Sequence, residues 1–172
     1  APVESNFTAR FQSEDYTPLL FLGHYDDEVA ASWEQDGVIS VTYRVFLTTV
    51  MAWWLGQGAI TMDSGAGHIF VIVVGASEDT ALDGMTASLS DGSGAVVYWG
   101  ADGTTLNSEL TASSTAGSVV IGNVAPGTHT LNIAHESLVC DNARAWLSDD
   151  PNTYTVPVEA GTVTVIYVSC GA

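Results

Sequence analysis

The stretch that decides the fold is Gly117-Ser-Val-Val-Ile-Gly-Asn-Val-Ala-Pro-Gly-Thr-His-Thr-Leu-Asn-Ile133. Runs of β-branched residues stand on both sides of the turn-forming pair Pro126-Gly127, a pattern typical of two antiparallel strands joined by a tight turn. The end of the chain repeats this pattern, because Ala160-Gly161 precedes an alternating run over residues 162–169. These segments predict a protein built from antiparallel strands.

From residue 69 onward, short apolar or alternating runs are separated by turn dipeptides such as Asp83-Gly84 and Asp102-Gly103. Such pairs supply the positive φ that tight turns require. The runs predict strands over residues 69–74, 86–90, 95–99, 119–124, 128–134, 154–158 and 162–169. Short strands spaced by turns are typical of two packed sheets, so we predict an all-β fold, an antiparallel β-sandwich of about seven strands.

Two segments resemble a known family. They are Leu82-Asp-Gly-Met-Thr-Ala-Ser-Leu89 and residues 115–131, which hold the Pro-Gly hairpin. With the final strand, they make residues 69–170 similar to the carboxypeptidase regulatory-like family, whose fold is a transthyretin-like, Cna-B-like β-sandwich. The resemblance implies a non-catalytic domain that braces an enzyme or serves as a repeat in adhesins and surface proteins. It carries over no functional residue, and the long segment between Cys140 and Tyr154 departs from it.

Residues 1–66 lie outside the resemblance, and we expect them to form a β-rich extension of the domain 67–172. Residues 38–47 alternate as a strand does, and residues 24–32 are expected to form a short helix whose first-turn acidic residues suit the helix dipole. A weaker alternation places Phe7, Ala9 and Phe11 on one face of a short N-terminal strand.

The composition excludes several function classes. The net charge is −17, and the chain has three arginines and no lysine. Nucleic-acid binding needs cations that displace counterions from phosphates, so we expect no nucleic-acid partner. No apolar run reaches the roughly 18 residues that a membrane-spanning helix needs, so we expect no membrane insertion.

The N-terminal sequence Ala-Pro-Val-Glu-Ser fits a mature chain left by signal-peptide cleavage or a processed chain, and we expect a secreted protein, extracellular or at the cell surface. Cys140 and Cys170 each follow a strand-like segment, and no Cys-x-x-Cys or Cys/His ligand spacing exists. We predict a disulfide between them, with two buried free thiols as the alternative. Asn6-Phe7-Thr8 makes Asn6 a candidate glycosylation site.

No motif indicates catalysis. The cluster His24-Tyr-Asp-Asp-Glu28 has the residue types for a divalent metal or for acid–base chemistry, although a capped surface helix explains it better. Acidic turns at Asp91, Asp102 and Asp150 offer oxygen ligands to calcium but lack the spacing of a calcium loop. His129 and His135 are expected to be ordinary strand residues. We therefore expect no enzyme activity, no cofactor and no metal centre.

Five tryptophans, at positions 33, 53, 54, 99 and 146, fit the core, a contact between subunits, or sugar stacking if they are coplanar. If residues 50–58 form a strand, the adjacent Trp53 and Trp54 point to opposite faces, and one of them faces away from the core. Phe7, Ala9, Phe11, Trp53 and Trp54 are thus our candidate interface.

The expected function is that of a non-catalytic, secreted structural or adhesive protein. We expect it to assemble with itself, as a homo-oligomer or an extracellular surface filament, through its N-terminal strand. The alternative is an extracellular module that binds a carbohydrate or calcium, with a glycan or a divalent cation as its partner. Whether the N-terminal strand pairs within its own chain or with a neighbour stays open at this point.

Overall fold

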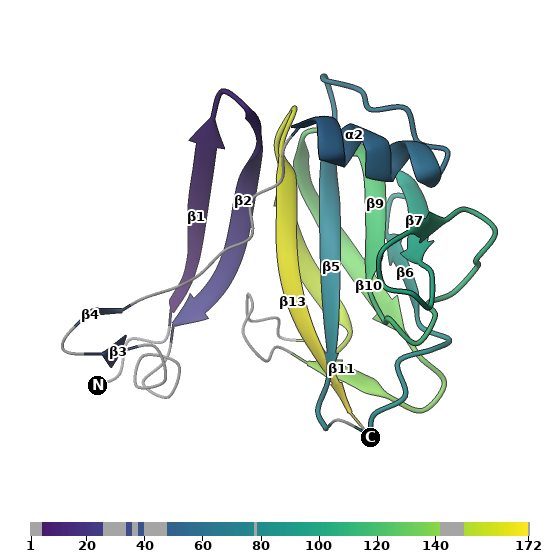
Figure 1. Cartoon of the computed structure of the whole chain (residues 1–172). Coiled ribbons are helices and arrows are strands. Elements are labelled where there is room, and N and C mark those ends of the chain that lie inside the picture. The colour runs from purple at the N-terminus through teal and green to yellow at the C-terminus, as the bar shows by residue number, and fades with distance from the viewer. Residues whose placement is uncertain are drawn as a thin grey trace.

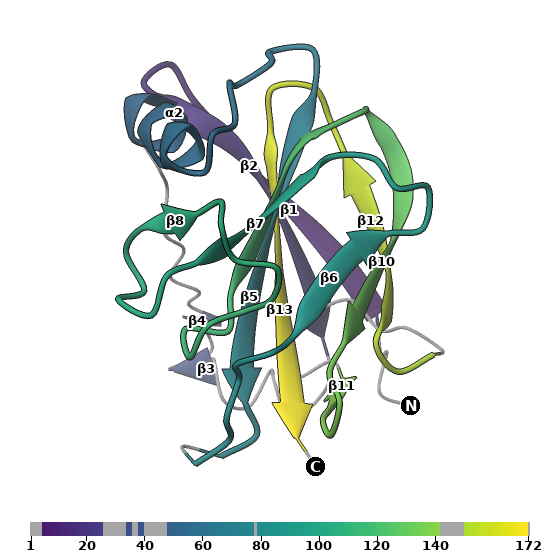
Figure 2. The same cartoon turned by 90° about the vertical axis from the view of Figure 1, so that its right-hand side faces the viewer.

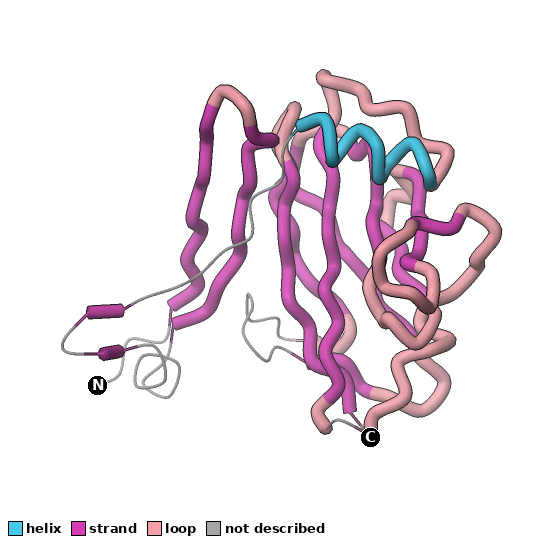
Figure 3. Tube along the Cα trace, viewed as in Figure 1, coloured by secondary structure: helices cyan, strands magenta, loops and turns pink. Residues whose placement is uncertain are grey.

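The computed structural model describes residues 5–25, 34–35, 38–39, 48–77, 79–141 and 150–171. Within these ranges the chain folds into two packed β-sheets and a helix, α2 (Thr48–Gln57), as Figures 1 and 3 show. The predicted all-β sandwich is confirmed. No helix in this part of the chain is long and apolar enough to cross a membrane.

The large sheet has the strand order β1-β2-β13-β5-β9-β7-β8, and β11 pairs with the end of β13. Its strands are β1 (Ser5–Ser13), β2 (Tyr16–Tyr25), β13 (Val163–Gly171), β5 (Gly67–Gly75), β9 (Val119–Val124), β7 (Ala95–Trp99), β8 (Leu106–Asn107) and β11 (Val139–Asp141). The small sheet has the order β12-β10-β6. Its strands are β12 (Thr153–Val158), β10 (Gly127–Ala134) and β6 (Thr86–Leu89), and β3 (Glu34–Gln35) pairs separately with β4 (Val38–Ile39).

Each strand predicted after residue 69 corresponds to an observed strand, with bounds that differ by at most two residues. Two pairings depart from an antiparallel sandwich, because β13 runs parallel to both β5 and β2. Alternation along a strand records which face is buried but not the direction of its neighbour, so the sequence pattern did not reveal these pairings.

In the N-terminal part, the short strand is observed as β1, and the following apolar run forms β2, which we had not predicted. His24 and Tyr25 end β2, so the predicted helix does not begin at His24. The rest of that segment lies outside the described residues. Of the strand predicted over residues 38–47, only 38–39 are described, in β4.

The two faces of the large sheet have different neighbours (Figure 2). Alternate side chains of β5, such as Ile69 and Val71, face the small sheet and pack with buried residues such as Leu131 of β10. The intervening Phe70 and Ile72 face the opposite side, where α2 lies. Because both faces carry apolar residues, the sequence of β5 is a continuous apolar run rather than an alternating one.

Residues 48–57 are a helix, not the strand that we had considered. Met51 and Leu55, four residues apart, lie on the same face of α2 and are fully buried against the sheet. The two tryptophans therefore do not point to opposite faces as they would in a strand, although Trp53 is 57% exposed while Trp54 is half-buried. Ala59, at φ 57°, ends the helix in the left-handed conformation that is typical of helix C-caps.

The predicted disulfide between Cys140 and Cys170 is confirmed. The two residues are directly opposite each other in the pairing of β11 with β13, and both are fully buried. The segment before β11 is β10 of the small sheet. The disulfide therefore fastens the chain to the large sheet at the point where it crosses from one sheet to the other.

Candidate functional site

The face of the large sheet that α2 crosses holds a cavity of about 730 Å³. Pockets that bind small molecules have volumes in this range, typically about 300–1,000 Å³. Its lining is dominated by aromatic side chains, which come from β1, α2, β5, β7 and β13. They are Phe11, Trp53, Trp54, Phe70, Trp99 and Tyr167.

The strands place these side chains by simple alternation. Phe70 and Ile72 of β5 line the cavity, as do Val165 and Tyr167 of β13, while the residues between them face the core of the sandwich. The helix α2 supplies Trp53 and Trp54 from its C-terminal half. Segments that are far apart in the sequence thus meet on this face.

Three of the rings touch one another and form what we call the aromatic corner: Trp54, Phe70 and Trp99. The ring centroids of Trp54 and Trp99 are 5.4 Å apart at an interplanar angle of 84°, and those of Phe70 and Trp99 are 6.3 Å apart at 90°. Rings at right angles enclose a corner instead of a flat platform. The coplanarity that sugar stacking requires is therefore not met by Trp54 and Trp99, and Trp33 and Trp146 lie outside the described residues.

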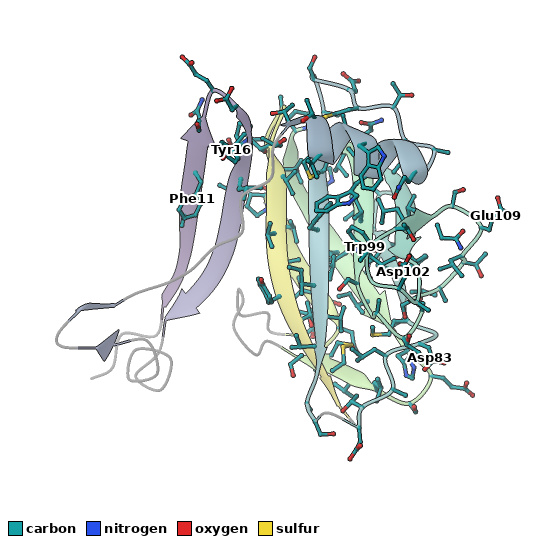
Figure 4. The ribbon with its side chains drawn as sticks, in the orientation of Figure 1. Phe11, Tyr16, Asp83, Trp99, Asp102 and Glu109 are labelled. Carbon is teal, nitrogen blue, oxygen red and sulfur yellow. A yellow bond between two sulfur atoms is a disulfide. The ribbon has the colours of Figure 1, made fainter. Side chains whose placement is uncertain are left out.

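One end of the cavity is polar, at the loop that joins β7 to β8. Thr104 and Thr105 line the cavity there, and Asp102 accepts hydrogen bonds from both backbone N–H groups, at 2.9 and 3.1 Å, and from the Thr105 hydroxyl at 2.8 Å. The hydrogen bond from the Thr104 backbone, followed by those from Thr105, lowers the pKa of Asp102 to about 2. Figure 4 labels Asp102 and Trp99 among the side chains of this part of the molecule. The loop that supplies Thr104 and Thr105 to the lining thus carries a negative charge on Asp102.

The acidic turn at Asp91 is explained by hydrogen bonding. Asp91 accepts hydrogen bonds from the backbone N–H and the hydroxyl of Ser93, and these bonds, more than the nearby His129, lower its pKa. The ring of His129 is hydrogen-bonded to Asp91 on one side and to the carbonyl of Ala125 on the other. The Nδ1 atom of His135 accepts hydrogen bonds from the backbone N–H groups of Ser137 and Leu138. Among the described residues, no three His, Cys, Asp or Glu side chains converge as metal ligands do. Asp26, Asp27 and Glu28 lie outside that part of the chain.

The candidate interface residues are placed in two groups. Phe7, Ala9 and Phe11 belong to β1, which pairs with β2 of the same chain, and Phe11 also lines the cavity. Trp53 and Trp54 line the cavity from α2. Asn6 lies in β1, opposite His24.

Sequence reasoning missed that Phe70, Trp99 and Tyr167 line one cavity together with the α2 tryptophans. One signal was available, since the continuous apolar run of β5 implies that both of its faces are covered. The pattern did not identify what covers the second face.

A buried histidine lies on the same face of the sheet. His68 is 0% exposed, its Nδ1 accepts a hydrogen bond from the backbone N–H of Asn123 at 3.2 Å, and its Nε2 has no partner among the described residues. Burial lowers the pKa of His68 below 6.5, and the nearby Asp63 opposes this only in part. The ring is therefore neutral in the folded protein.

We expect acidification to destabilise the fold through His68. Below pH 6.5 the histidine of the unfolded chain takes up a proton while the buried one stays neutral. The free energy of unfolding therefore falls as the pH decreases from 6.5 toward the folded-state pKa, by at most about 1.4 kcal/mol per pH unit. Urea denaturation at several pH values between 7.5 and 5, on the native protein and on His68→Gln, measures this effect. The variant is expected to depend less on pH, and parallel curves would contradict the assignment.

Comparison with the sequence models of known protein families gave no match, and comparison with curated proteins gave none either. The similarity of residues 69–170 to the carboxypeptidase regulatory-like family therefore stays a prediction.

Proposed function

We propose that this protein is a non-catalytic structural subunit of an extracellular assembly, and that neighbouring copies join by β-strand addition at the outer edge of β1. The observation that carries the proposal is the edge itself. β1 is nine residues long and is the last strand of the described sheet, so its outer row of backbone N–H and C=O groups is paired with no strand in that part of the chain. Such an edge is a template for pairing with another chain.

The edge has little of the usual protection, since the irregularity in its pairing with β2 lies near the end of the strand, between Phe11 and Ser13. Edge strands are commonly guarded by lysine, proline or a bulge that turns the edge away. The sequence of β1 has no lysine and no proline, and its one cation, Arg10, is ion-paired with Glu159 of the same chain. Arg10 is thus engaged by its own subunit.

The hairpin of β1 and β2 is well placed for a neighbour. Its strands have nine and ten residues, yet β2 pairs with β13 only where residues 19–21 lie opposite residues 163–165. Below this contact the hairpin diverges from β13 (Figure 1). Most of it therefore extends beyond the sandwich.

The mode of contact follows from the in-chain pairing. Because β1 already pairs with β2 of its own chain, the neighbour adds to its outer edge rather than receiving β1 as a donated strand. Pairing of one β1 with another would close into a dimer. Pairing of β1 with a different edge, such as that of β6 or β12 in the small sheet, repeats without closing and builds a filament, which is the arrangement that we propose.

Two further features support the proposal, one on location and one on assembly. The disulfide belongs to a class of bond that persists in oxidising compartments. The net charge of −17 with no lysine keeps single subunits apart at low salt. We expect assembly to become firmer as salt or divalent cations screen this repulsion.

A pair of neighbouring proline substitutions tests the contact. Backbone N–H groups along an antiparallel edge strand point alternately toward the partner strand and away from it, so one of Thr8→Pro and Ala9→Pro removes an outward N–H. We expect that variant to keep its fold and to assemble only at a concentration at least about tenfold higher, a loss equivalent to roughly 1.4 kcal/mol. Sedimentation velocity and electron microscopy in high salt measure assembly, and circular dichroism measures the fold.

Deletion of residues 1–11 provides a second test. If the truncated protein stays folded and no longer assembles, the N-terminal strand is required. A native protein that remains monomeric in high salt at all concentrations would refute the proposal. Undiminished assembly of both proline variants would also refute it, because the outer edge of β1 would then play no part.

A further inference from the structure

We propose that the cavity on the outer face of the large sheet binds a small quaternary ammonium compound, with its cationic head group in the aromatic corner formed by Trp54, Phe70 and Trp99. This activity is separate from strand addition at the edge of β1. It assigns a ligand class to the cavity described above.

The shape of the corner suits a compact, rounded group. Trp99 meets both Trp54 and Phe70 at nearly a right angle, with centroid distances of 5.4 and 6.3 Å. Aromatic rings that meet at an angle surround a rounded cation and attract it through their electron-rich faces, and quaternary ammonium groups are commonly bound in this way. Flat sugar rings instead require an exposed flat platform, which these rings do not provide.

The charges around the cavity favour a cation. No lining residue is itself charged. The nearest charge in the sequence to the lining threonines is Asp102, whose carboxylate is ionised at any pH well above 2. Arg10 is the one lysine or arginine among the described residues, and its ion pair with Glu159 already balances its charge. A cationic ligand therefore meets attraction and no competing positive charge from this part of the chain.

The helix adds to this field. Trp54 lies in the last turn of α2, and that turn contains no basic residue. The C-terminal end of a helix carries a partial negative charge, which stabilises a cation near the last turn. The helix dipole and Asp102 thus act in the same direction.

The cavity is fitted to a small ligand more than to a second copy of the chain. A second copy could place a cation in the cavity only from its three arginines, because the chain has no lysine. The volume of about 730 Å³ accommodates a small molecule with an aliphatic tail along the apolar residues Ile72 and Val165.

Titration with choline tests the proposal, because 3,3-dimethyl-1-butanol has the same shape without the charge. We expect tryptophan fluorescence and calorimetry to show saturable binding of one choline per chain, and the neutral analogue to bind at least about tenfold more weakly. Trp99→Leu should weaken choline binding by about fivefold to thirtyfold, and the milder Trp99→Phe by less. Asp102→Asn should weaken it by about twofold at low salt, and this loss should shrink as salt is added.

Tyr16→Leu serves as the matched control, because Tyr16 is an exposed aromatic residue outside the lining. Its choline affinity should equal that of the native protein. Equal affinities for choline and its neutral analogue would overturn the proposal, as would absence of choline binding. Tighter binding of a lysine-containing peptide or of a neutral oligosaccharide would overturn it too. Assembly measured on Trp99→Phe should be unchanged, which separates this site from the edge of β1.

Discussion

Replacing both Cys140 and Cys170 by alanine is expected to lower the free energy of unfolding by about 3.5 kcal/mol, as the chain-entropy estimate gives for a loop closed across 30 residues. The disulfide closes a loop that holds β12 and most of β13. Without it, the unfolded chain gains the freedom of that loop. Loss of sulfur from a buried site adds to the effect, since Cys170 Sγ lies 3.7 Å from Met85 Sδ in the core.

The native protein and the double variant should be compared by guanidinium denaturation with and without reductant. The native protein is expected to lose stability when it is reduced, while the variant should be insensitive to reductant. Cys140 is held in place by other bonds as well, because its carbonyl accepts a hydrogen bond from the Tyr154 hydroxyl at 2.8 Å. Native-like circular dichroism of the variant would show that these contacts survive. Equal stability with and without reductant in the native protein would contradict the prediction.

The strands of the second half were predictable because their signals are local. A strand such as β9 is a short apolar run, and the next strand, β10, follows it after Pro126-Gly127. Alternation and turn residues report burial and reversal within a few residues of themselves. Pairing across the sheet is not local, and the parallel neighbours of β13 come from residues 16–25 and 67–75, which no local pattern connects.

The helix α2 was missed for a related reason. Its sequence, Thr-Thr-Val-Met-Ala-Trp-Trp-Leu-Gly-Gln, contains β-branched and aromatic residues that favour strands, and it has no acidic residue in its first turn. Burial of Met51 and Leu55 against the sheet overrides these preferences. The cavity depends on this helix, so the site was no more predictable than the helix was.

Gly67→Ala is expected to lower the free energy of unfolding by about 3 kcal/mol, at the upper end of what overpacking usually costs. A Cβ at this position would lie 2.5 Å from Val158 Cγ1 and would overlap the carbonyl oxygen of Glu159. Val158 is the last residue of β12 in the small sheet, and Gly67 is the first residue of β5 in the large sheet. The glycine therefore allows the two sheets to meet at this end of the sandwich.

The clash cannot be relieved cheaply, because backbone hydrogen bonds fix both segments. The N–H of His68 donates to the carbonyl of Thr162 at 2.9 Å, and the N–H of Gly161 donates to the carbonyl of Ala66 at 2.8 Å. Any shift that admits a methyl group weakens these bonds, which brace the turn between β12 and β13. Gly56→Ala is the matched control, since nothing lies within 4 Å of its added Cβ and alanine favours a helix, so that variant should be more stable by up to about 1 kcal/mol. Thermal and chemical denaturation of both variants measure the contrast, and a Gly67→Ala protein as stable as the native one would show that the sheets do not approach so closely at this end.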